Sequence, residues 1–310
     1  MTKVVATFPA FTLGHRPLNW LTAASIVSSL VVVGLYFTDG RELLGVSVWE
    51  KPLKFLLSTA VYAATFSWFY SLVDARKRVV WWLGNLIAVM LVLELVIIVG
   101  LASVGLTSHF NVSNGFQITM WSLMATGIST LWFLSFGVGA YLWRTTAVGP
   151  VVRDGIRWGV AIGLLGMGLA FTMTQPTSDQ LADFQGIAGA HTVGAGDGGP
   201  GLPFLGWSTV GGDLRIAHFV GLHGLQVLPL VAIILVRLVS SEVLQRALLH
   251  GVGVTYVLLV ALVFAQALAG EPITSPSTLT VAGVAGSFAL GITTSALTGL
   301  VGRSRATYAR

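Results

Sequence analysis

The sequence predicts an all-α polytopic membrane protein, a single bundle of about eight transmembrane helices that takes in residues 1–310. Its composition is the first reason, because 55% of the residues are hydrophobic and only 9% are charged. A soluble domain carries roughly 25% charged residues, so this chain cannot cover itself with a polar surface. The second reason is a set of apolar runs of about 20 residues, the length at which a helix crosses ~30 Å of hydrocarbon.

Eight such runs follow one another along the chain. They span residues 17–37, 51–73, 79–101, 116–143, 153–174, 214–237, 246–268 and 279–301. The first run lacks a convincing small-residue cleavage site and seven more follow it, so we interpret it as a retained helix rather than a signal peptide. The chain has no cysteine, which excludes disulfides, thiolate metal sites and a cysteine nucleophile.

Lysine and arginine are distributed unevenly between the two ends of these helices. Thirteen of the 17 fall on the side of the N terminus, namely Lys3, Arg16, Arg76, Lys77, Arg78, Arg144, Arg153, Arg157, Arg237, Arg246, Arg303, Arg305 and Arg310. The other four are Arg41, Lys51, Lys54 and Arg215. By the positive-inside rule this predicts that both termini are cytoplasmic. The +5 net charge is then a topology signal and does not indicate nucleic acid.

Residues 175–212 form a long outer connection between the fifth and sixth predicted helices, rich in Gly, Pro, Ser and Asp. Structureless loops beyond ~12–15 residues are uncommon, and are usually functional or disordered. Phe204, Leu205 and Trp207 argue against disorder, because such side chains tend to be buried. We therefore expect a cap in which residues 186–212 fold over the outer mouth of the bundle and bury Trp207 against helix ends.

The stretch "GGDLRIAHFVGLHGLQVLPL", residues 211–230, is unusually polar for the start of a membrane helix. At 100° per residue its polar side chains share an arc of roughly 140°. These side chains are Arg215, His218, His223 and Gln226. The small residues Ala217, Gly221 and Gly224 form a separate stripe that lets a neighbouring helix approach closely. Asp213 is placed to cap the first turn.

Polar residues from distant segments meet at the outer end in this topology. The candidate metal ligands are His109, His191, His218, His223 and Asp197. The candidate catalytic carboxylates are Glu94 and Asp213. The candidate substrate-binding residues are Lys51, Lys54, Arg215 and Gln226. Imidazole and carboxylate bind Zn, Fe or Cu, haem iron takes an axial histidine, and a buried carboxylate serves as acid or base.

Each candidate also has a structural interpretation. Asp213 could serve only as a helix cap, Arg215 could extend to lipid headgroups, and Lys51 and Lys54 could anchor a helix end. His15 and His250 fall on the inner side and are interpreted as incidental.

Buried charges demand partners. A charge at the depth of Glu94 costs at least ~2.5–3.5 kcal/mol when unpaired. We expect Glu94 to pair with His223, because their estimated depths match, and His218 to lie nearer His109 and His191.

At "WEKPLKF", "SHFN", "HTVGAGDGGPGLP" and "GDLRIAHFVGLHGLQVLPL", the chain resembles an uncharacterised family of bacterial multipass membrane proteins. The resemblance covers about residues 20–270 and supplies no activity, but it implies that these motifs act as one unit. It also implies that the protein lies in a bacterial cytoplasmic (inner) membrane. The chain is unlike the membrane desaturases, whose histidine boxes are absent. It is also unlike retinal proteins, because residues 279–301 contain no lysine.

Three functions stay open at this point. The favoured one is a metal- or haem-dependent membrane enzyme or redox protein, an oxidoreductase or hydrolase, whose substrate is a lipid, a quinone-like molecule or a small anion. The alternative is a proton-coupled or small-solute transporter in which Glu94 and His223 carry protons. The third is a structural or sensory subunit whose cap binds another protein.

Overall fold

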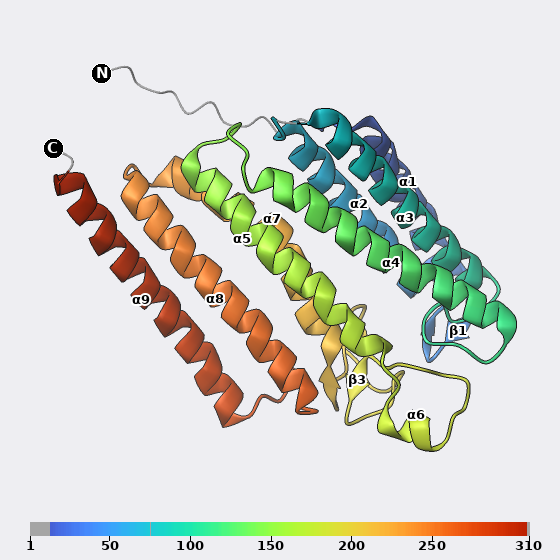
Figure 1. Cartoon of the computed structure of the whole chain (residues 1–310). Helices are drawn as coiled ribbons and strands as arrows, with labels where there is room; N and C mark the ends of the chain where they lie inside the picture. Colours follow the sequence, from blue (N-terminus) through green and yellow to red (C-terminus); the bar gives the residue numbers. More distant parts are fainter. Residues whose placement is uncertain (1–12, 75, 309–310) are drawn as a thin grey trace.

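A computed structural model describes residues 13–74 and 76–308 of the chain, and most of these residues are helical (Figure 1). Their eight long helices are α1 (Arg16–Thr38), α2 (Glu50–Ser71), α3 (Lys77–Ser103), α4 (Gly115–Leu142), α5 (Pro150–Leu169), α7 (Leu214–Leu238), α8 (Glu242–Leu268) and α9 (Thr278–Tyr308). Each of the eight predicted runs overlaps one of them, so the all-helical prediction is confirmed. Lys3 and Arg310, used above for topology, lie outside the described residues.

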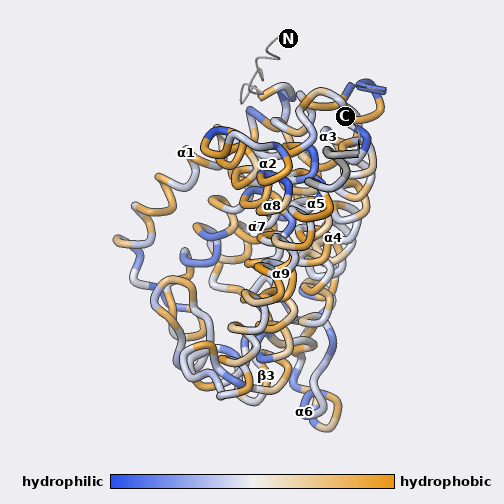
Figure 2. Tube along the Cα trace, turned by 90° about the vertical axis from the view of Figure 1, so that its left-hand side faces the viewer, coloured by the Kyte–Doolittle hydropathy of each residue, from blue (hydrophilic) through white to orange (hydrophobic). Residues whose placement is uncertain are grey.

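The connections contain the remaining elements. A turn of 3-10 helix, η1 (Ala170–Thr174), continues α5, and the short α6 (Ser178–Ala182) follows. Strands β1 (Glu42–Leu43) and β2 (Val46–Ser47) pair antiparallel between α1 and α2. Strands β3 (Thr192–Val193) and β4 (Gly212–Asp213) pair antiparallel just before α7. Figure 2 shows hydrophobic residues along the helices, with hydrophilic residues mostly at the two ends.

Seven helices of the described chain are long and apolar enough to cross a membrane, as a multipass membrane protein requires. The predicted span 51–73 forms a helix, α2, but α2 is not among the seven. Its position explains why. More than half of its residues are buried, so α2 has little need of an apolar surface that faces lipid.

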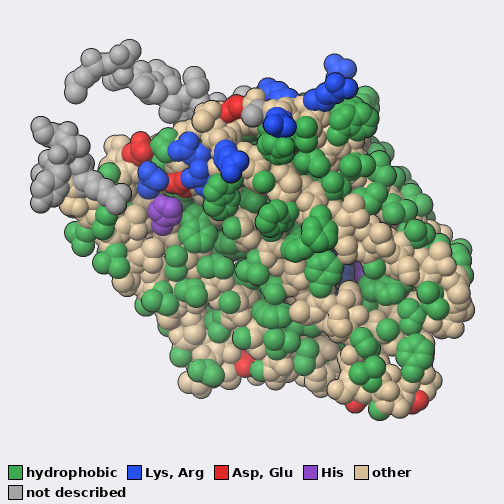
Figure 3. All heavy atoms as spheres, viewed as in Figure 1, with side chains coloured by type: hydrophobic (Ala, Val, Ile, Leu, Met, Phe, Trp, Pro, Cys, Tyr) green, Lys and Arg blue, Asp and Glu red, His purple; other side chains and the backbone are tan. Residues whose placement is uncertain are grey.

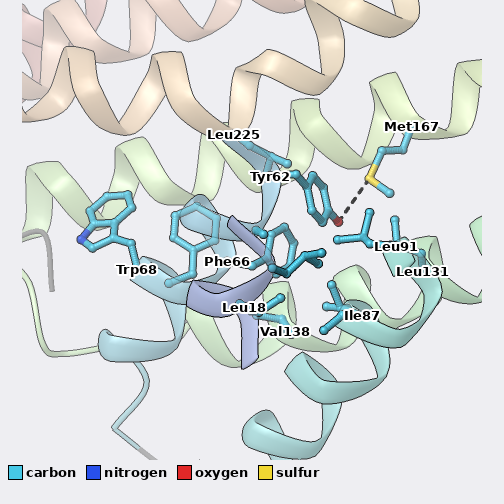
Figure 4. Packing of buried hydrophobic residues seen from close by; sticks show 14 of the residues in the cluster. Leu18, Tyr62, Phe66, Trp68, Ile87, Leu91, Leu131, Val138, Met167 and Leu225 are labelled. Atoms are coloured by element: carbon cyan, nitrogen blue, oxygen red, sulfur yellow. Dashed lines mark hydrogen bonds between the residues drawn. The ribbon is translucent and has the colours of Figure 1, made fainter. Parts of the chain in front are cut away.

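Helix α2 packs at the centre of the largest cluster of buried hydrophobic residues in the described part of the chain. Figure 4 shows Tyr62 and Phe66 of α2 among side chains from five other helices. Those labelled are Leu18 of α1, Ile87 and Leu91 of α3, Leu131 and Val138 of α4, Met167 of α5 and Leu225 of α7. The Tyr62 hydroxyl donates to the Met167 sulfur at 3.9 Å and lies within hydrogen-bonding distance of the Ser135 hydroxyl. The one polar atom of this ring is therefore satisfied by two further helices.

Helices α5 and α7 pack closely through glycine. A Cβ added to Gly166 would lie 2.3 Å from the backbone nitrogen of Leu222, and one added to Gly221 would lie 2.6 Å from the Cα of Gly166. A Cβ on Gly159 would lie 2.8 Å from the Gly224 carbonyl. The expected small-residue stripe on α7 is thus a contact with α5, which fixes how α7 presents its polar residues.

We predict that Gly166→Ala lowers the thermal stability of the purified protein, while Gly168→Ala leaves it unchanged or slightly raised. The new methyl group at Gly166 meets backbone atoms that cannot move aside, and overpacking of this kind costs about 1–3 kcal/mol. At Gly168 a Cβ makes only ordinary contact with the Trp132 ring, at 3.8 Å. Unfolding in detergent, followed by tryptophan fluorescence, checks this. Equal melting temperatures for the two variants would contradict the packing described.

Candidate functional site

A buried carboxylate, an imidazole and an ammonium group form a row at one end of the bundle. They belong to Glu94 of α3, His109 in the loop before α4, and Lys51 in the first turn of α2. His109 Nε2 lies 4.0 Å from Glu94 Oε1, and Lys51 Nζ lies 2.8 Å from His109 Nδ1. An ammonium group can only donate, so Nδ1 accepts and the ring proton of a neutral His109 sits on Nε2, facing Glu94.

Aromatic rings surround His109. The ring centroids of Phe55, Phe110 and Trp121 lie 5.8, 6.0 and 5.5 Å from its own. Burial lowers the pKa of His109 well below its usual range, and the positive charge of Lys51 lowers it further. The imidazole is therefore neutral near pH 7, in agreement with the direction of the Lys51 hydrogen bond.

Glu94 is incompletely satisfied. Its side chain is 9% exposed, and its Oε2 atom has no hydrogen-bond partner within the described part of the chain. A buried polar atom left without a partner costs about 1–3 kcal/mol, and more if it is charged. The open carboxylate oxygen makes Glu94 the leading candidate among these residues for binding a proton or a ligand.

The expected pairing of His223 with Glu94 is wrong, because His109 occupies that position. His223 Nδ1 lies 3.2 Å from Gln226 Oε1, and the Gln226 amide donates to Thr65 Oγ1 at 2.9 Å. Helix α2 packs against α3, and its side chains bond to His109 in the loop before α4 and to Gln226 of α7. Glu94 of α3 and His223 of α7 were estimated to lie at similar depths, but similar depth does not place two helices side by side.

A second group of charges fastens the connection to the helix ends. The Asp213 carboxylate is fully buried, forms an ion pair with Arg215, and accepts from the Ser208 backbone N–H at 2.8 Å and the Arg215 N–H at 3.0 Å. The Arg215 guanidinium also donates to the Gly206 carbonyl. Asp213 thus caps α7, which was the structural interpretation of this residue. The Arg215 side chain is bound to Asp213 and to the backbone of the connection.

Lys54 holds the same loop from the side of α2. Its ammonium donates to the Phe204 carbonyl at 3.0 Å, to the Leu205 carbonyl at 3.3 Å, and to the Glu50 carboxylate at 2.7 Å. Trp207, expected to be buried, is half-buried, with its ring 5.6 Å from that of Phe219 on α7. Residues 202–208 therefore lie against the starts of α2 and α7.

His191 and Asp197 form a third group. The His191 Nδ1 lies 2.8 Å from the Asp197 carboxylate, which also accepts from the backbone N–H groups of His191 and Thr192. The His191 ring packs 4.8 Å from that of Phe110, centroid to centroid. Burial lowers the pKa of His191, against the opposing effect of Asp197.

The predicted metal ligands do not converge. His109 pairs with Lys51, His191 with Asp197, and His223 with Gln226. His218 donates from Nδ1 to the Gly166 carbonyl at 2.8 Å. Among the described residues, no group of three or more His, Asp or Glu side chains is arranged to hold a metal ion. The proposed metal centre gains no support from this arrangement.

Sequence reasoning missed Thr65 and Ser108, which lies 3.1 Å from His109 Nδ1 through its hydroxyl. Thr65 had a signal: it follows Lys51 by two heptads, so the two share one face of a helix. The two histidines interpreted above as incidental, His15 and His250, also have partners. His15 is fully buried, accepts from the Leu18 N–H and bonds the Trp81 carbonyl, while His250 lies 3.8 Å from Asp154.

No family model, curated protein or solved structure matches the chain. The resemblance to a family of bacterial multipass membrane proteins therefore stays a prediction.

We predict that acid loosens the connection before it loosens the helices. Burial depresses the pKa values of His109 and His191 in the folded state. Below the ordinary histidine pKa of about 6.5, both histidines bind protons more readily once the connection has opened than they do in the folded state, so the loss of stability begins there. Hydrogen exchange of residues 186–212, corrected for intrinsic rates, should show weaker protection at pH 5 than at pH 7.

The same exchange experiment separates the two histidines. His191→Asn keeps a donor to Asp197, and His109→Gln keeps an acceptor for Lys51. Each variant should lose part of the acid sensitivity, and the double variant nearly all of it. Unchanged sensitivity in the double variant would exclude these histidines as its source.

Proposed function

We propose that the protein is an integral membrane protein that exchanges a proton with a small anionic ligand at its outer end, through Glu94, His109 and Lys51. The observation that carries this proposal is the open Oε2 of a buried Glu94 beside an imidazole that contacts a lysine. Ionisable groups at this depth are costly and are usually retained for function. A carboxylate and an imidazole are also the usual groups of general acid–base chemistry.

The proposed proton transfer takes place in three steps, and each group that gives up a proton receives another. A protonated Glu94 gives its proton to the anion; His109 then gives its Nε2 proton to Glu94 across the present 4.0 Å gap, which must shorten. In the same movement Lys51 gives a proton to His109 Nδ1, to which it lies 2.8 Å away. Lys51, in the first turn of α2, then takes a proton from water at the outer surface.

The ionisable groups at the inner end, opposite Lys51, help to distinguish an enzyme from a carrier. A proton-coupled carrier needs ionisable groups that lead onward to the opposite side. The buried carboxylate at that end, Asp154, is already paired with Arg157 at 3.2 Å and Arg246 at 2.9 Å. This favours a membrane enzyme that performs acid–base chemistry at its outer end over a transporter.

We predict that a pH-difference infrared spectrum of the reconstituted protein contains the C=O stretching band of a protonated carboxyl group, and that Glu94→Gln removes it. His109→Gln should shift the band, because it removes the group that faces Glu94. Glu242→Gln alters an exposed carboxylate at the start of α8 and should leave the band unchanged. Addition of acetate or inorganic phosphate as the probe should perturb the band in the native protein.

Two outcomes would reject the proposal. One is a carboxyl band that survives in Glu94→Gln. The other is a Glu94 band that titrates in the same way with and without every anion tried, since proton exchange with a bound anion requires the two to be coupled. If pH-driven uptake of the anion into vesicles accompanies the band change, the carrier replaces the enzyme.

A second candidate, a haem- or metal-dependent redox protein, keeps one supporting observation. His218 and His223 each turn Nδ1 towards an oxygen acceptor, the Gly166 carbonyl and Gln226 Oε1. This hydrogen bond leaves Nε2 free of its proton and is the usual support of a metal-ligating histidine. An absorption spectrum with elemental analysis decides: a haem band or stoichiometric metal that disappears in His223→Ala would favour this candidate.

We further propose that the Lys51 end faces outward from a bacterial cytoplasmic membrane, with both termini cytoplasmic. Figure 3 supports this orientation, because the Lys and Arg side chains of the visible face gather at the opposite end. Since the chain lacks cysteine, single replacements report cleanly. Asp183→Cys should react with an impermeant thiol reagent from outside, and Lys77→Cys only after the membrane is opened. Outside labelling of Lys77→Cys would reverse the orientation.

A further inference from the structure

A groove lies between α4 and α5, with a volume of about 680 Å³. Figure 3 views this face, and the surface is hollowed between the two helices. Apolar side chains line most of the groove, among them Trp132, Phe136 and Leu164, and Arg144 stands at the end nearest the α4–α5 turn. The groove is therefore apolar along its length and positive at one end.

Two hydrogen-bonded bridges connect the helices at the ends of the groove. Trp132 Nε1 donates to the Leu164 carbonyl at 2.9 Å, and Arg157 donates to the Trp143 carbonyl at 2.9 and 2.7 Å. Between the bridges the lining residues Ala140 and Ala161 are small and exposed. Short side chains between two fixed bridges leave room that larger ones would fill, so the groove is a built feature of this helix pair.

The Arg144 side chain is available to bind a ligand. Its side chain is exposed, and its guanidinium makes no ion pair or hydrogen bond with the described residues. The neighbouring Arg157, in contrast, is bound to the Trp143 carbonyl and to Asp154. A free guanidinium binds a phosphate with two parallel hydrogen bonds. Trp143, 47% exposed beside it, belongs to the residue types that concentrate at the membrane–water interface.

The length of the groove matches one leaflet. Arg144, two residues beyond the end of α4, follows Trp132 of α4 by twelve residues, which is about 18 Å at the helical rise of 1.5 Å per residue. Half of the hydrocarbon core of a bilayer is about 15 Å thick. An acyl chain whose headgroup lies at Arg144 would therefore run the length of the groove to the middle of the membrane.

We propose that this groove binds one anionic phospholipid of the inner leaflet, with its phosphate at Arg144 and one acyl chain along the groove between α4 and α5. The charge of Arg144 selects an anionic headgroup, and the apolar walls take the chain. The site lies on the lipid-facing side of α4 and α5 and does not depend on the proton-exchange function proposed for Glu94.

Native mass spectrometry of the full chain in detergent tests this, with dioleoylphosphatidylglycerol and dioleoylphosphatidylcholine as probes. The native protein should retain one phosphatidylglycerol in preference to phosphatidylcholine. Arg144→Gln should weaken phosphatidylglycerol binding about tenfold, the size expected for loss of one charge-assisted contact, and should remove the preference. Arg78→Gln, another exposed arginine at the same end, is the matched control and should change nothing.

Ala161→Phe fills the groove and should abolish retention of both lipids. Ala285→Phe makes the same change at an exposed position of α9 and should not. Equal retention of the two lipids by the native protein would overturn the headgroup assignment, and full retention by Ala161→Phe would overturn the site. Arg144 is at the surface, so its variant keeps the proposal testable if Ala161→Phe fails to fold.

Discussion

The burial of α2 inside the bundle is the constraint on which the other features depend. A helix that faces lipid on one side must be apolar there, whereas α2 contacts α1 and α3 and reaches α4, α5 and α7 through Tyr62 and Thr65. It can therefore carry polar groups at depths where a lipid-facing helix could not. Lys51 in its first turn and Thr65 further along the helix both use this freedom. Lys51 bonds to His109 of the loop before α4, and Thr65 bonds to Gln226 of α7.

The charged groups at the Lys51 end of the bundle differ in how many of their polar atoms have hydrogen-bond partners. Asp213, Arg215, Glu50 and Lys54 bond to one another or to the backbone of residues 204–208, and their role is to hold that loop on the helix ends. Glu94 lacks such a complete set. Since a buried polar atom is normally paired, the incomplete one is where binding chemistry is most reasonably sought. Proximity alone would have assigned all of these residues to one site.

Helix α5 packs against α7 on one face and against α4 on another, and the two contacts are of different kinds. Its glycine face meets α7 backbone to backbone, which holds His218 against the Gly166 carbonyl. Towards α4 it is connected chiefly by the bridges of Trp132 and Arg157, and the groove lies between them. Glycine gives close approach because it has no Cβ, whereas tryptophan and arginine connect helices that stand further apart.

The sequence by itself determined the number and order of the helices, the stripe of Gly221 and Gly224, the cap at Asp213, and the arrival of polar residues at one end. These are local properties, because hydropathy, helical periodicity and capping depend on residues within a few turns. Only the tertiary structure decided that Glu94 meets His109 and not His223, that Lys54 and Arg215 fasten a loop, and that α2 is interior. Position along a helix fixes the depth of a side chain through the rise per residue. It does not specify which helix lies beside it, because that choice depends on how all the helices pack together.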